Sequence, residues 1–261
     1  MNPFTITQLN DHIWNFTEDA PGTAVDAYLV CGTDRALFID TLQEAEGVYA
    51  KARQLTSLPM DVIITHGHYD HAGVSTKEFK EAGCAIYLAR ADWQVAKSMV
   101  TWDIPAGDYF TDLADGQTFE LGGRALTVMS LPGHTPGSVV LLDEADHILI
   151  SGDSIGSGPI WLQLEHSMPL SVFQAGVERL QKKTAGWKDI TILAGHRGQA
   201  NAPLGGQYIE DVKETARLVR GGELKGETQS MQIREREPIA FAVVQHGLMQ
   251  GFFYAPDRLE G

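Results

Sequence analysis

One arrangement of residues occurs four times along this chain and restricts how it can fold. An apolar segment of strand length runs into a small-residue turn that carries histidine or aspartate, as in DVIIT-HGHYDH, LTVMSL-PGH, ILIS-GD and ITILA-GH. Because a sheet aligns the ends of its strands, side chains on such turns can converge in one crevice. The pattern predicts a single site that contains His66, His68, Asp70, His71, His134, Asp153 and His196.

The first of these turns is the most specific signal. His66 and His68 are two residues apart, so in extended chain their side chains point the same way, whereas Asp70 and His71 follow where the chain turns into a helix. Three imidazoles and a carboxylate this close would repel and desolvate one another without a cation. These donors suit zinc, and also iron or manganese. We therefore expect two metal half-sites, with Asp153 as the carboxylate that both ions share.

The ligand pattern, in this order and spacing, resembles the metallo-β-lactamase fold superfamily, and the resemblance extends from the N-terminal strands to about residue 200. It implies an α/β fold, a four-layer αββα sandwich with the metals at one edge of its two sheets. It also implies that one ion is held by His66, His68 and His134, and that the other is held by Asp70, His71 and His196 with Asp153 bridging. Asp40-Thr41-Leu42 stands where the family has Asp-Thr-Gly. Asp40 is expected to support the metal loops.

The same resemblance narrows the expected reaction. True β-lactamases have Cys or Ser where this chain has Asp153, so the chain is similar instead to hydrolases of esters, thioesters, lactones and phosphoesters. It lacks the basic C-terminal region of glyoxalase II, and Gly156 replaces a tyrosine that lactonases usually have. The leading hypothesis is a metal-dependent hydrolase of a small-molecule ester, thioester or lactone. In this mechanism a hydroxide that bridges two divalent ions, most simply zinc, attacks the substrate carbonyl. Asp70 is the expected catalytic residue. The alternatives are an oxidoreductase similar to mononuclear iron persulfide dioxygenases, a phosphodiester hydrolase, and a non-catalytic metal-binding module.

Charge and composition limit the partners. Acidic residues outnumber basic ones by 34 to 20, which disfavours nucleic-acid binding, and the mixed-charge run at 234–237 reads as a solvated turn. No apolar run approaches the roughly 18 residues of a membrane span, and the N-terminus has no secretory pattern. We expect a cytoplasmic enzyme of one domain (1–261) that acts on a small molecule, with a homodimer possible. Cys31 and Cys84 read as small core residues.

Hydrophobic periodicity predicts a run of strands followed by a region of mixed helices and strands, and this order occurs twice along the chain. Strands are expected at 4–9, 12–16, 25–30, 36–40, 61–65, 85–89, 124–131, 138–144, 147–151, 190–194, 228–233, 239–244 and 248–254. Helices are expected at 44–57, 72–82, 90–100, 169–183 and 205–220.

The remaining segments are candidate walls for a substrate pocket. They are 17–26, 101–112 and 155–168, and together with Tyr69 they suggest a partly apolar pocket lined by Tyr69, Tyr109, Trp161 and His166. The competing interpretation is that these aromatic residues pack a lid or a dimer contact. Lys97 and Arg197 are the candidate cations for an anionic substrate group. Isolated histidines are usually ordinary surface or core residues, which is the default for His12, His147, His166 and His246.

Overall fold

The computed structural model describes residues 3–20, 23–105, 109–200, 204–232 and 238–261. Its N-terminal part is a seven-stranded sheet whose strands follow chain order. The strands are β1 (Phe4–Gln8), β2 (Ile13–Ala20), β3 (Thr23–Cys31), β4 (Ala36–Ile39), β5 (Met60–Ile63), β6 (Ile86–Leu88) and β7 (Thr111–Asp112). Strands β1 to β4 pair antiparallel, and β4 to β7 pair parallel.

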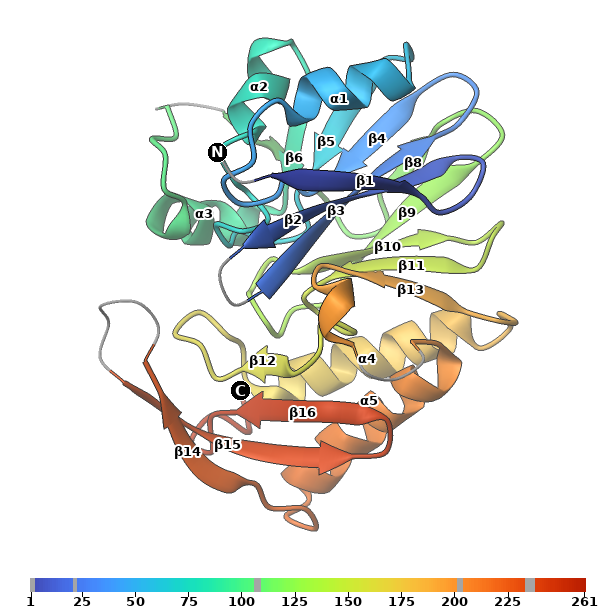
Figure 1. Cartoon of the computed structure of the whole chain (residues 1–261). Helices are drawn as coiled ribbons and strands as arrows, with labels where there is room; N and C mark the ends of the chain where they lie inside the picture. The colour runs from blue at the N-terminus through green and yellow to red at the C-terminus, as the bar shows by residue number, and fades with distance from the viewer. Residues whose placement is uncertain (1–2, 21–22, 106–108, 201–203, 233–237) are drawn as a thin grey trace.

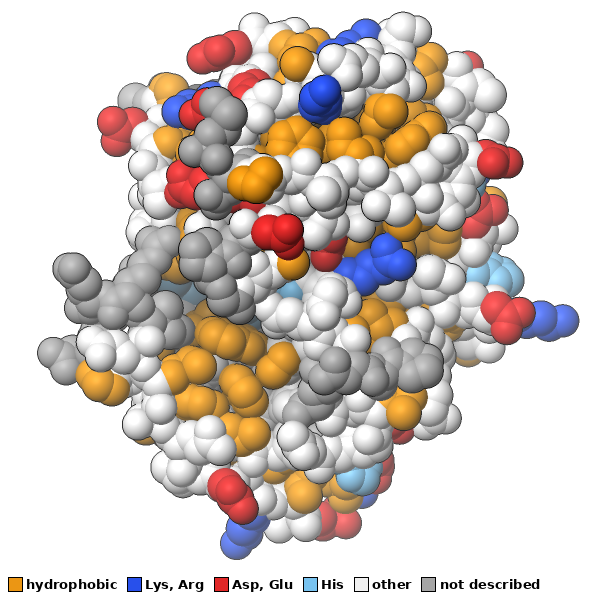
Figure 2. All heavy atoms as spheres, in the orientation of Figure 1, with side chains coloured by type: hydrophobic (Ala, Val, Ile, Leu, Met, Phe, Trp, Pro, Cys, Tyr) orange, Lys and Arg blue, Asp and Glu red, His pale blue; other side chains and the backbone are white. Residues whose placement is uncertain are grey.

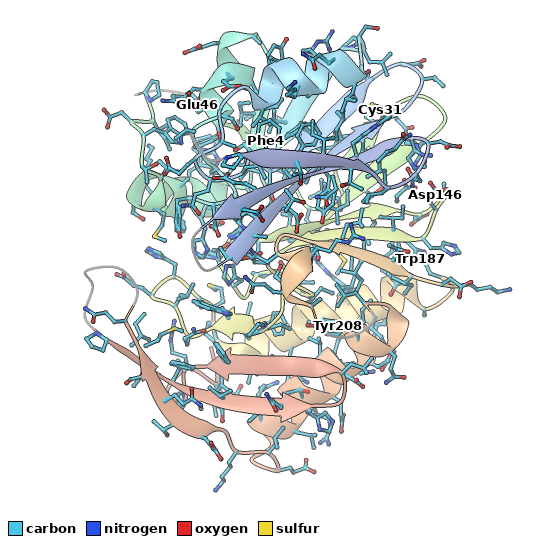
Figure 3. All side chains as sticks on the ribbon, in the orientation of Figure 1. Phe4, Cys31, Glu46, Asp146, Trp187 and Tyr208 are labelled. Atoms are coloured by element: carbon cyan, nitrogen blue, oxygen red, sulfur yellow. The ribbon has the colours of Figure 1, made fainter. Side chains whose placement is uncertain are left out.

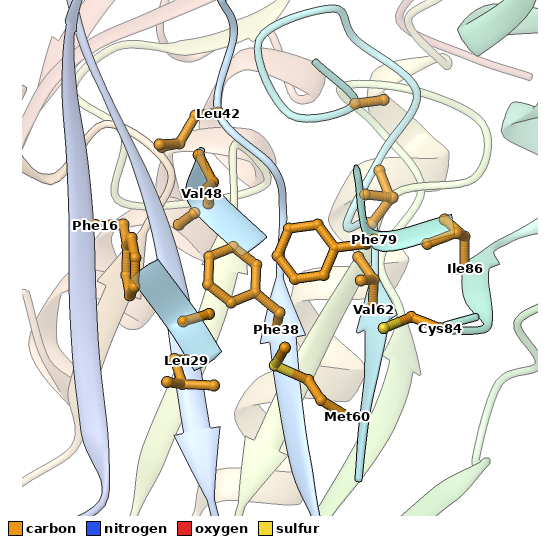
Figure 4. Packing of buried hydrophobic residues seen from close by; sticks show 14 of the residues in the cluster. Phe16, Leu29, Phe38, Leu42, Val48, Met60, Val62, Phe79, Cys84 and Ile86 are labelled. Carbon is orange, nitrogen blue, oxygen red and sulfur yellow. The ribbon is translucent and has the colours of Figure 1, made fainter. Parts of the chain in front are cut away.

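Side chains of this sheet alternate between two hydrophobic clusters, as a period of two requires. In β4, Phe38 faces the cluster shared with the helices, whereas Leu37 and Ile39 face the second sheet. The helices on the outer face are α1 (Val48–Leu55), α2 (Thr76–Glu81), the 3-10 turn η1 (Arg90–Asp92) and α3 (Trp93–Met99) (Figure 1). Figure 4 shows Phe16, Phe38 and Phe79 side by side in this outer cluster, with ring centroids 5.0 and 4.7 Å apart.

A second sheet of five strands, in the order β13-β11-β10-β9-β8, packs against the inner face of the first. Its strands are β8 (Thr118–Glu120), β9 (Ala125–Ser130), β10 (Val139–Asp143), β11 (Ile148–Gly152) and β13 (Thr191–Ala194). The inter-sheet core joins residues such as Tyr28 and Ile63 to Val128, Leu141 and Ile150. Helices α4 (Leu170–Thr184) and α5 (Gly206–Arg220) cover the outer face, which completes the expected αββα sandwich.

Beyond these four layers the chain adds a third sheet, in the order β12-β16-β15-β14. Its strands are β12 (Ile160–Leu162), β14 (Glu227–Met231), β15 (Ile239–His246) and β16 (Met249–Tyr254). Phe252 and Val244 of this sheet share a cluster with Phe173 of α4 and Val212 of α5. The C-terminal strands therefore pack on the α4 and α5 layer, below the sandwich in Figure 1.

The predicted elements are confirmed, with ends that differ by a few residues, and α5 ends at Arg220 with Gly221 as its C-cap. The strands β7, β8 and β12 were not expected, because two or three residues are too short to show a period. β12 lies inside the segment 155–168 that was expected to be irregular. Residues 21–22, 106–108 and 233–237 lie outside the described residues, and with them parts of two predicted pocket segments and the mixed-charge run. Within the described residues, no helix is long and apolar enough to cross a membrane.

Candidate metal centre

The four predicted ligand turns meet at one edge of the two inner sheets. One of them follows β5 in the first sheet, and the other three follow β9, β11 and β13 in the second. β10 is antiparallel to both β9 and β11, and β11 is parallel to β13, so these three ligand-bearing strands run in one direction. Their carboxyl ends, and the turns beyond them, are thereby brought together.

The first ligand group consists of three buried histidines, His66, His68 and His134. The Nε2 atom of His66 lies 3.2 Å from Nδ1 of His68, and Nε2 of His134 lies 2.9 Å from the same atom. Nitrogens bound to one tetrahedral zinc at about 2.0–2.1 Å are about 3.3 Å apart. Both separations are therefore close to the spacing that a single ion requires, and all three nitrogens lie within 4.8 Å of one another.

The second ligand group consists of Asp70, His71, Asp153 and His196. Oδ1 of Asp153 lies 3.3 Å from Nε2 of His71, and Oδ2 lies 3.2 Å from Nε2 of His196. Oδ2 of Asp153 is also 3.7 Å from Nε2 of His134, which belongs to the first group. Asp153 is thus the carboxylate that lies near histidines of both groups, as expected of a shared ligand.

The outer ring nitrogens of three ligands have fixed partners, and these partners determine which nitrogen faces the site. The Nδ1 atoms of His134 and His196 lie 2.8 and 2.7 Å from the carbonyl oxygens of Trp161 and Ala24. Nδ1 of His71 lies 2.9 Å from Oδ2 of Asp40. An Nδ1–H donated to each oxygen leaves a lone pair on Nε2, directed at the centre of the group.

Asp40 is the supporting residue that the sequence predicted. Its carboxylate also accepts hydrogen bonds from the backbone N–H and the hydroxyl of Thr65, at 2.7 and 2.9 Å. It does so from a left-handed backbone conformation (φ 61°), which is costly for a residue other than glycine. The strain is consistent with a backbone held in place so that one carboxylate can reach both Thr65 and His71.

The protonation of the two groups differs. Burial lowers the pKa of His66 well below its usual value and that of His68 to about 3, so these two ligands are neutral imidazoles. Although burial works against it, the Asp153 carboxylate raises the pKa of both His71 and His196. Burial alone would raise the pKa of Asp70, but the His71 and His196 rings outweigh it and lower this pKa to about 2. In the metal-free protein, protonated His71 and His196 therefore supply the positive charge that balances the carboxylates of the second group.

The donor set fits a pair of metal ions. Nε2 of His71 is fully buried and has no hydrogen-bond partner among the described residues, although it faces two carboxylates. A buried ring nitrogen without a partner is costly, and a cation would satisfy it. A Cβ at Gly195 would lie 2.4 Å from the His71 ring and 2.6 Å from Asp153, so only glycine leaves this space open.

Asp92 is a residue of the site that sequence reasoning missed. Its fully buried carboxylate accepts hydrogen bonds from the backbone N–H groups of Gly67 and Gly137 and from the Thr135 hydroxyl, at 2.7, 2.6 and 2.6 Å. Burial raises its pKa. It therefore joins the turn of His66 and His68 to the turn of His134. A single aspartate on a helical segment carries no sequence signal for this role.

The metal groups open into a cavity of about 1020 Å³. His68, Asp70, His134, Asp153 and His196 line one side of it, and among the predicted pocket residues Tyr69, Trp161 and His166 line it as well. Tyr109 does not belong to the described lining, and its assignment to the pocket was wrong. Its ring is buried in the outer cluster of the first sheet beside Trp102 and Phe110, with centroids 5.4 and 5.2 Å away.

Comparison with known proteins agrees with this geometry. A model of the metallo-beta-lactamase superfamily matches residues 20–196, a stretch that includes every ligand described above. The chain belongs to this superfamily. Among solved structures, a metallo-beta-lactamase from Pontibacter korlensis superposes with a TM-score of 0.64 at 20% identity, covering 82% of this chain and 99% of that one. At that identity the likeness concerns the fold.

Several curated proteins are similar in sequence. Acyl-coenzyme A thioesterase MBLAC2 of Gallus gallus is 28% identical over 209 residues, which are 67% of this chain and 73% of that protein. Its Homo sapiens counterpart is 30% identical over 179 residues, 54% of this chain and 62% of that protein. A hydroxyacylglutathione hydrolase of Ectopseudomonas mendocina is 31% identical over 98 residues, 38% of this chain and 34% of that one. The chain thus spans only part of the length of each of these relatives.

The superfamily match ends at residue 196, but the cavity continues beyond it. Its opposite wall comes from the C-terminal sheet and the segment after it, with Pro238, Ile239, Ala240, Ala255, Asp257 and Arg258. Figure 2 shows histidine side chains between the two halves of the molecule and hydrophobic side chains gathered on the C-terminal half beside them. In this member of the metallo-beta-lactamase superfamily, the metal ligands and the facing wall therefore come from different parts of the chain.

The cation of the described lining is Arg258, rather than the Lys97 or Arg197 suggested by the sequence. Its guanidinium donates to the carbonyl oxygens of Ser167, Gln163 and Leu164 at 2.8, 2.8 and 2.9 Å. These contacts tie the loop that carries His166 to the C-terminal segment. Arg258 thus acts mainly on the shape of the cavity wall.

A third cluster of possible ligands, His12, Asp143 and Asp146, lies away from the site. Figure 3 shows Asp146 at the margin of the molecule, near the turn between β10 and β11. Nη1 of Arg124 is 2.6 Å from Asp143 and 3.1 Å from Asp146, and His12 is 2.8 Å from Asp146. An arginine already forms ion pairs with both carboxylates, which explains the cluster without a metal ion.

Proposed function

We propose that this protein hydrolyses small-molecule thioesters at a centre of two divalent metal ions, with zinc as the metal. The observation that carries the proposal is the pair of ligand groups, joined through Asp153, that opens into one cavity with a largely apolar far wall. The relatives named as thioesterase and as hydroxyacylglutathione hydrolase support the choice of a thioester. The cytoplasm remains the expected compartment.

Each ligand group would hold one ion, and Asp153 would contact both. Such a pair supplies an activated water near neutral pH and polarises a substrate carbonyl. The protein holds the imidazoles in the correct tautomers through Asp40 and the Trp161 and Ala24 carbonyls. The cavity wall orients the acyl compound above them.

Asp70 is the residue we assign to proton handling. In the metal-free protein the His71 and His196 rings outweigh burial and lower its pKa to about 2. With metal ions bound, their positive charge would keep this carboxylate ionised, so it would accept a hydrogen bond from the attacking water. It is not a store of protons for the leaving group. A thiol has a pKa of about 8.5, so a thiolate leaves without being protonated first, whereas an alkoxide requires an acid. This difference favours thioesters over ordinary esters.

The cavity also favours a carbonyl substrate over a phosphodiester. In the described lining, Arg258 is the one Lys or Arg side chain, and its guanidinium binds three backbone carbonyls. Phosphate recognition generally uses an available Arg or Lys. A neutral acyl group needs no such partner.

The test combines metal analysis with a substrate panel. Protein purified without added metal should contain about two zinc ions per chain, and it should hydrolyse an acyl thioester at least tenfold faster than a matched ester, a lactone or a phosphodiester. His66→Ala should lose bound metal and activity together. His12→Ala is the matched control, because it removes a histidine from the cluster that Arg124 pairs with, and it should keep both.

Two results would overturn the proposal. One is a preference for the phosphodiester. The other is a single iron per chain with oxygen consumed in the presence of a persulfide, which would instead support an oxidoreductase.

A further inference from the structure

One polar side chain in the cavity has a buried atom with no partner. Gln163 directly follows β12, lines the cavity and is 1% exposed. Its Nε2 lies 3.4 Å from the Met231 sulfur, a weak acceptor. Its Oε1 is buried and has no hydrogen-bond partner in the described part of the chain. Buried amide oxygens are nearly always paired, so this one points to a partner that comes from outside the protein.

The backbone holds Gln163 at a fixed offset from the metal ligands. Two residues earlier, the Trp161 carbonyl lies 2.8 Å from Nδ1 of His134. The Gln163 carbonyl itself accepts a hydrogen bond of 2.8 Å from Arg258. A side chain on a backbone that is anchored on both sides is suited to recognise a group at a set distance from the reacting carbonyl.

Apolar side chains share the cavity with Gln163. Leu164, Ile239, Ala240 and Ala255 line it, together with polar and charged side chains such as Glu165, Gln199 and Asp257. The polar groups of such a cavity determine how a ligand is oriented. A carboxamide offers one acceptor and two donors, and rotation of its terminal torsion exchanges the side on which each lies. The ligand group that matches both is a secondary amide, with one N–H and one C=O.

We propose that Gln163 recognises a secondary amide of the substrate, and so determines specificity for amide-bearing thioesters. This inference rests on the thioester hydrolysis proposed above. The amide could belong to the thiol arm, separated from the sulfur by an ethylene spacer, or to the acyl arm. Both sources present the same chemistry to Gln163, and the substrates below distinguish them.

The test compares kcat/KM for three thioesters of equal chain length on the zinc-loaded protein. The hexanoyl thioester of N-acetylcysteamine has the amide in the thiol arm, the N-acetyl-β-alanyl thioester of pentanethiol has it in the acyl arm, and the hexanoyl thioester of pentanethiol has none. We expect the wild type to prefer one amide-bearing substrate over the amide-free one by about tenfold, the size of one buried hydrogen bond. Gln163→Met should reduce that ratio to about one.

Controls separate recognition from structural damage. Met231→Leu removes the sulfur contact of the carboxamide but keeps the amide, and it should preserve the wild-type ratio. If Gln163→Met does not fold, Gln163→Asn, which withdraws the amide by one methylene, should lower the same ratio. A general loss of structure would lower all three values together and leave the ratio unchanged.

The two proposals fail in different ways. Equal kcat/KM for the three thioesters in the wild type, or an unchanged ratio in the Gln163 variants, would overturn the role of Gln163 and leave thioester hydrolysis standing. Hydrolysis of none of the three by the zinc-loaded protein would overturn the proposed function itself.

Discussion

At the scale of single residues, the site depends on side chains that contact the ligands rather than on the ligands alone. Asp40 accepts from Thr65 at two points and lies 2.9 Å from Nδ1 of His71. It fixes the tautomer of His71 and holds the turn on which the first ligands stand. Such supporting carboxylates typically change metal affinity by 10–100-fold when they are removed.

Asp40→Asn should therefore weaken metal binding by about 10–100-fold while the chain still folds. The amide that replaces one oxygen would direct a donor at either Thr65 or His71, which are donors themselves. Competition with a zinc-sensitive chelator measures the change. Asp34→Asn, at an exposed aspartate of the same sheet, is the matched control. Equal affinity in the two variants would contradict the role given to Asp40.

Metal binding should release protons from the second ligand group. The Asp153 carboxylate raises the pKa of His71 and His196 against burial, so both carry protons near pH 7 in the metal-free protein, and zinc must displace them. Affinity for the second ion should therefore fall as the pH drops below the raised pKa values of His71 and His196. The first ion should release none from His66 or His68, whose pKa burial lowers. A weakly buffered titration with a pH dye measures this, and release with the first equivalent would contradict the assignment.

At the scale of elements, the ligand turns are joined across the fold. Asp92, where η1 meets α3, accepts from the turn after β5 and from the turn after β9. A Cβ at Gly137 would lie 2.7 Å from the Asp92 carboxyl carbon, so this turn fits closely around the carboxylate. The helical segment thereby sets the spacing of the first ligand group.

Asp92→Ala should leave the N–H groups of Gly67 and Gly137 buried and unpaired. Each such group costs about 1–3 kcal/mol, so the free energy of unfolding of the metal-free protein should fall by about 2–6 kcal/mol. Urea denaturation measures this loss, and zinc titration should show weaker binding of the first ion. A variant with wild-type stability would show that the two loops do not depend on Asp92.

At the scale of the whole molecule, the metal centre connects the two inner sheets. Its ligands stand on turns after β5 of one sheet and after β9, β11 and β13 of the other. Ions bound there stabilise the native state but not an unfolded chain, in which the ligands are dispersed.

Removal of the metals should therefore lower the thermal midpoint. At an ion concentration 1,000 times the dissociation constant, binding adds about 4 kcal/mol to stability, or about 8–16 °C for a chain of this size. Calorimetry of zinc-loaded and chelator-treated protein measures the difference, which zinc should restore. In Asp153→Ala the difference should be smaller than in the wild type, because the group of His66, His68 and His134 stays intact. A wild type with identical midpoints would argue against occupied sites.

The candidate ligand set, the main strands and helices, and the support from Asp40 could all be predicted from the sequence. These features depend on residues that are close in sequence. Ligand chemistry requires a few residues of one turn, and secondary structure shows in hydrophobic periods of two or 3.6 residues. Four further features appear only in the folded chain: Asp92 joins two ligand turns, Tyr109 packs in the core, β12 belongs to a third sheet, and the side-chain oxygen of Gln163 has no partner among the described residues. Each of these depends on partners distant in the chain, such as Gly137 for Asp92 and Met231 for Gln163, which no local pattern specifies. The chemistry of the centre is local, whereas the cavity that selects its substrate is a product of packing.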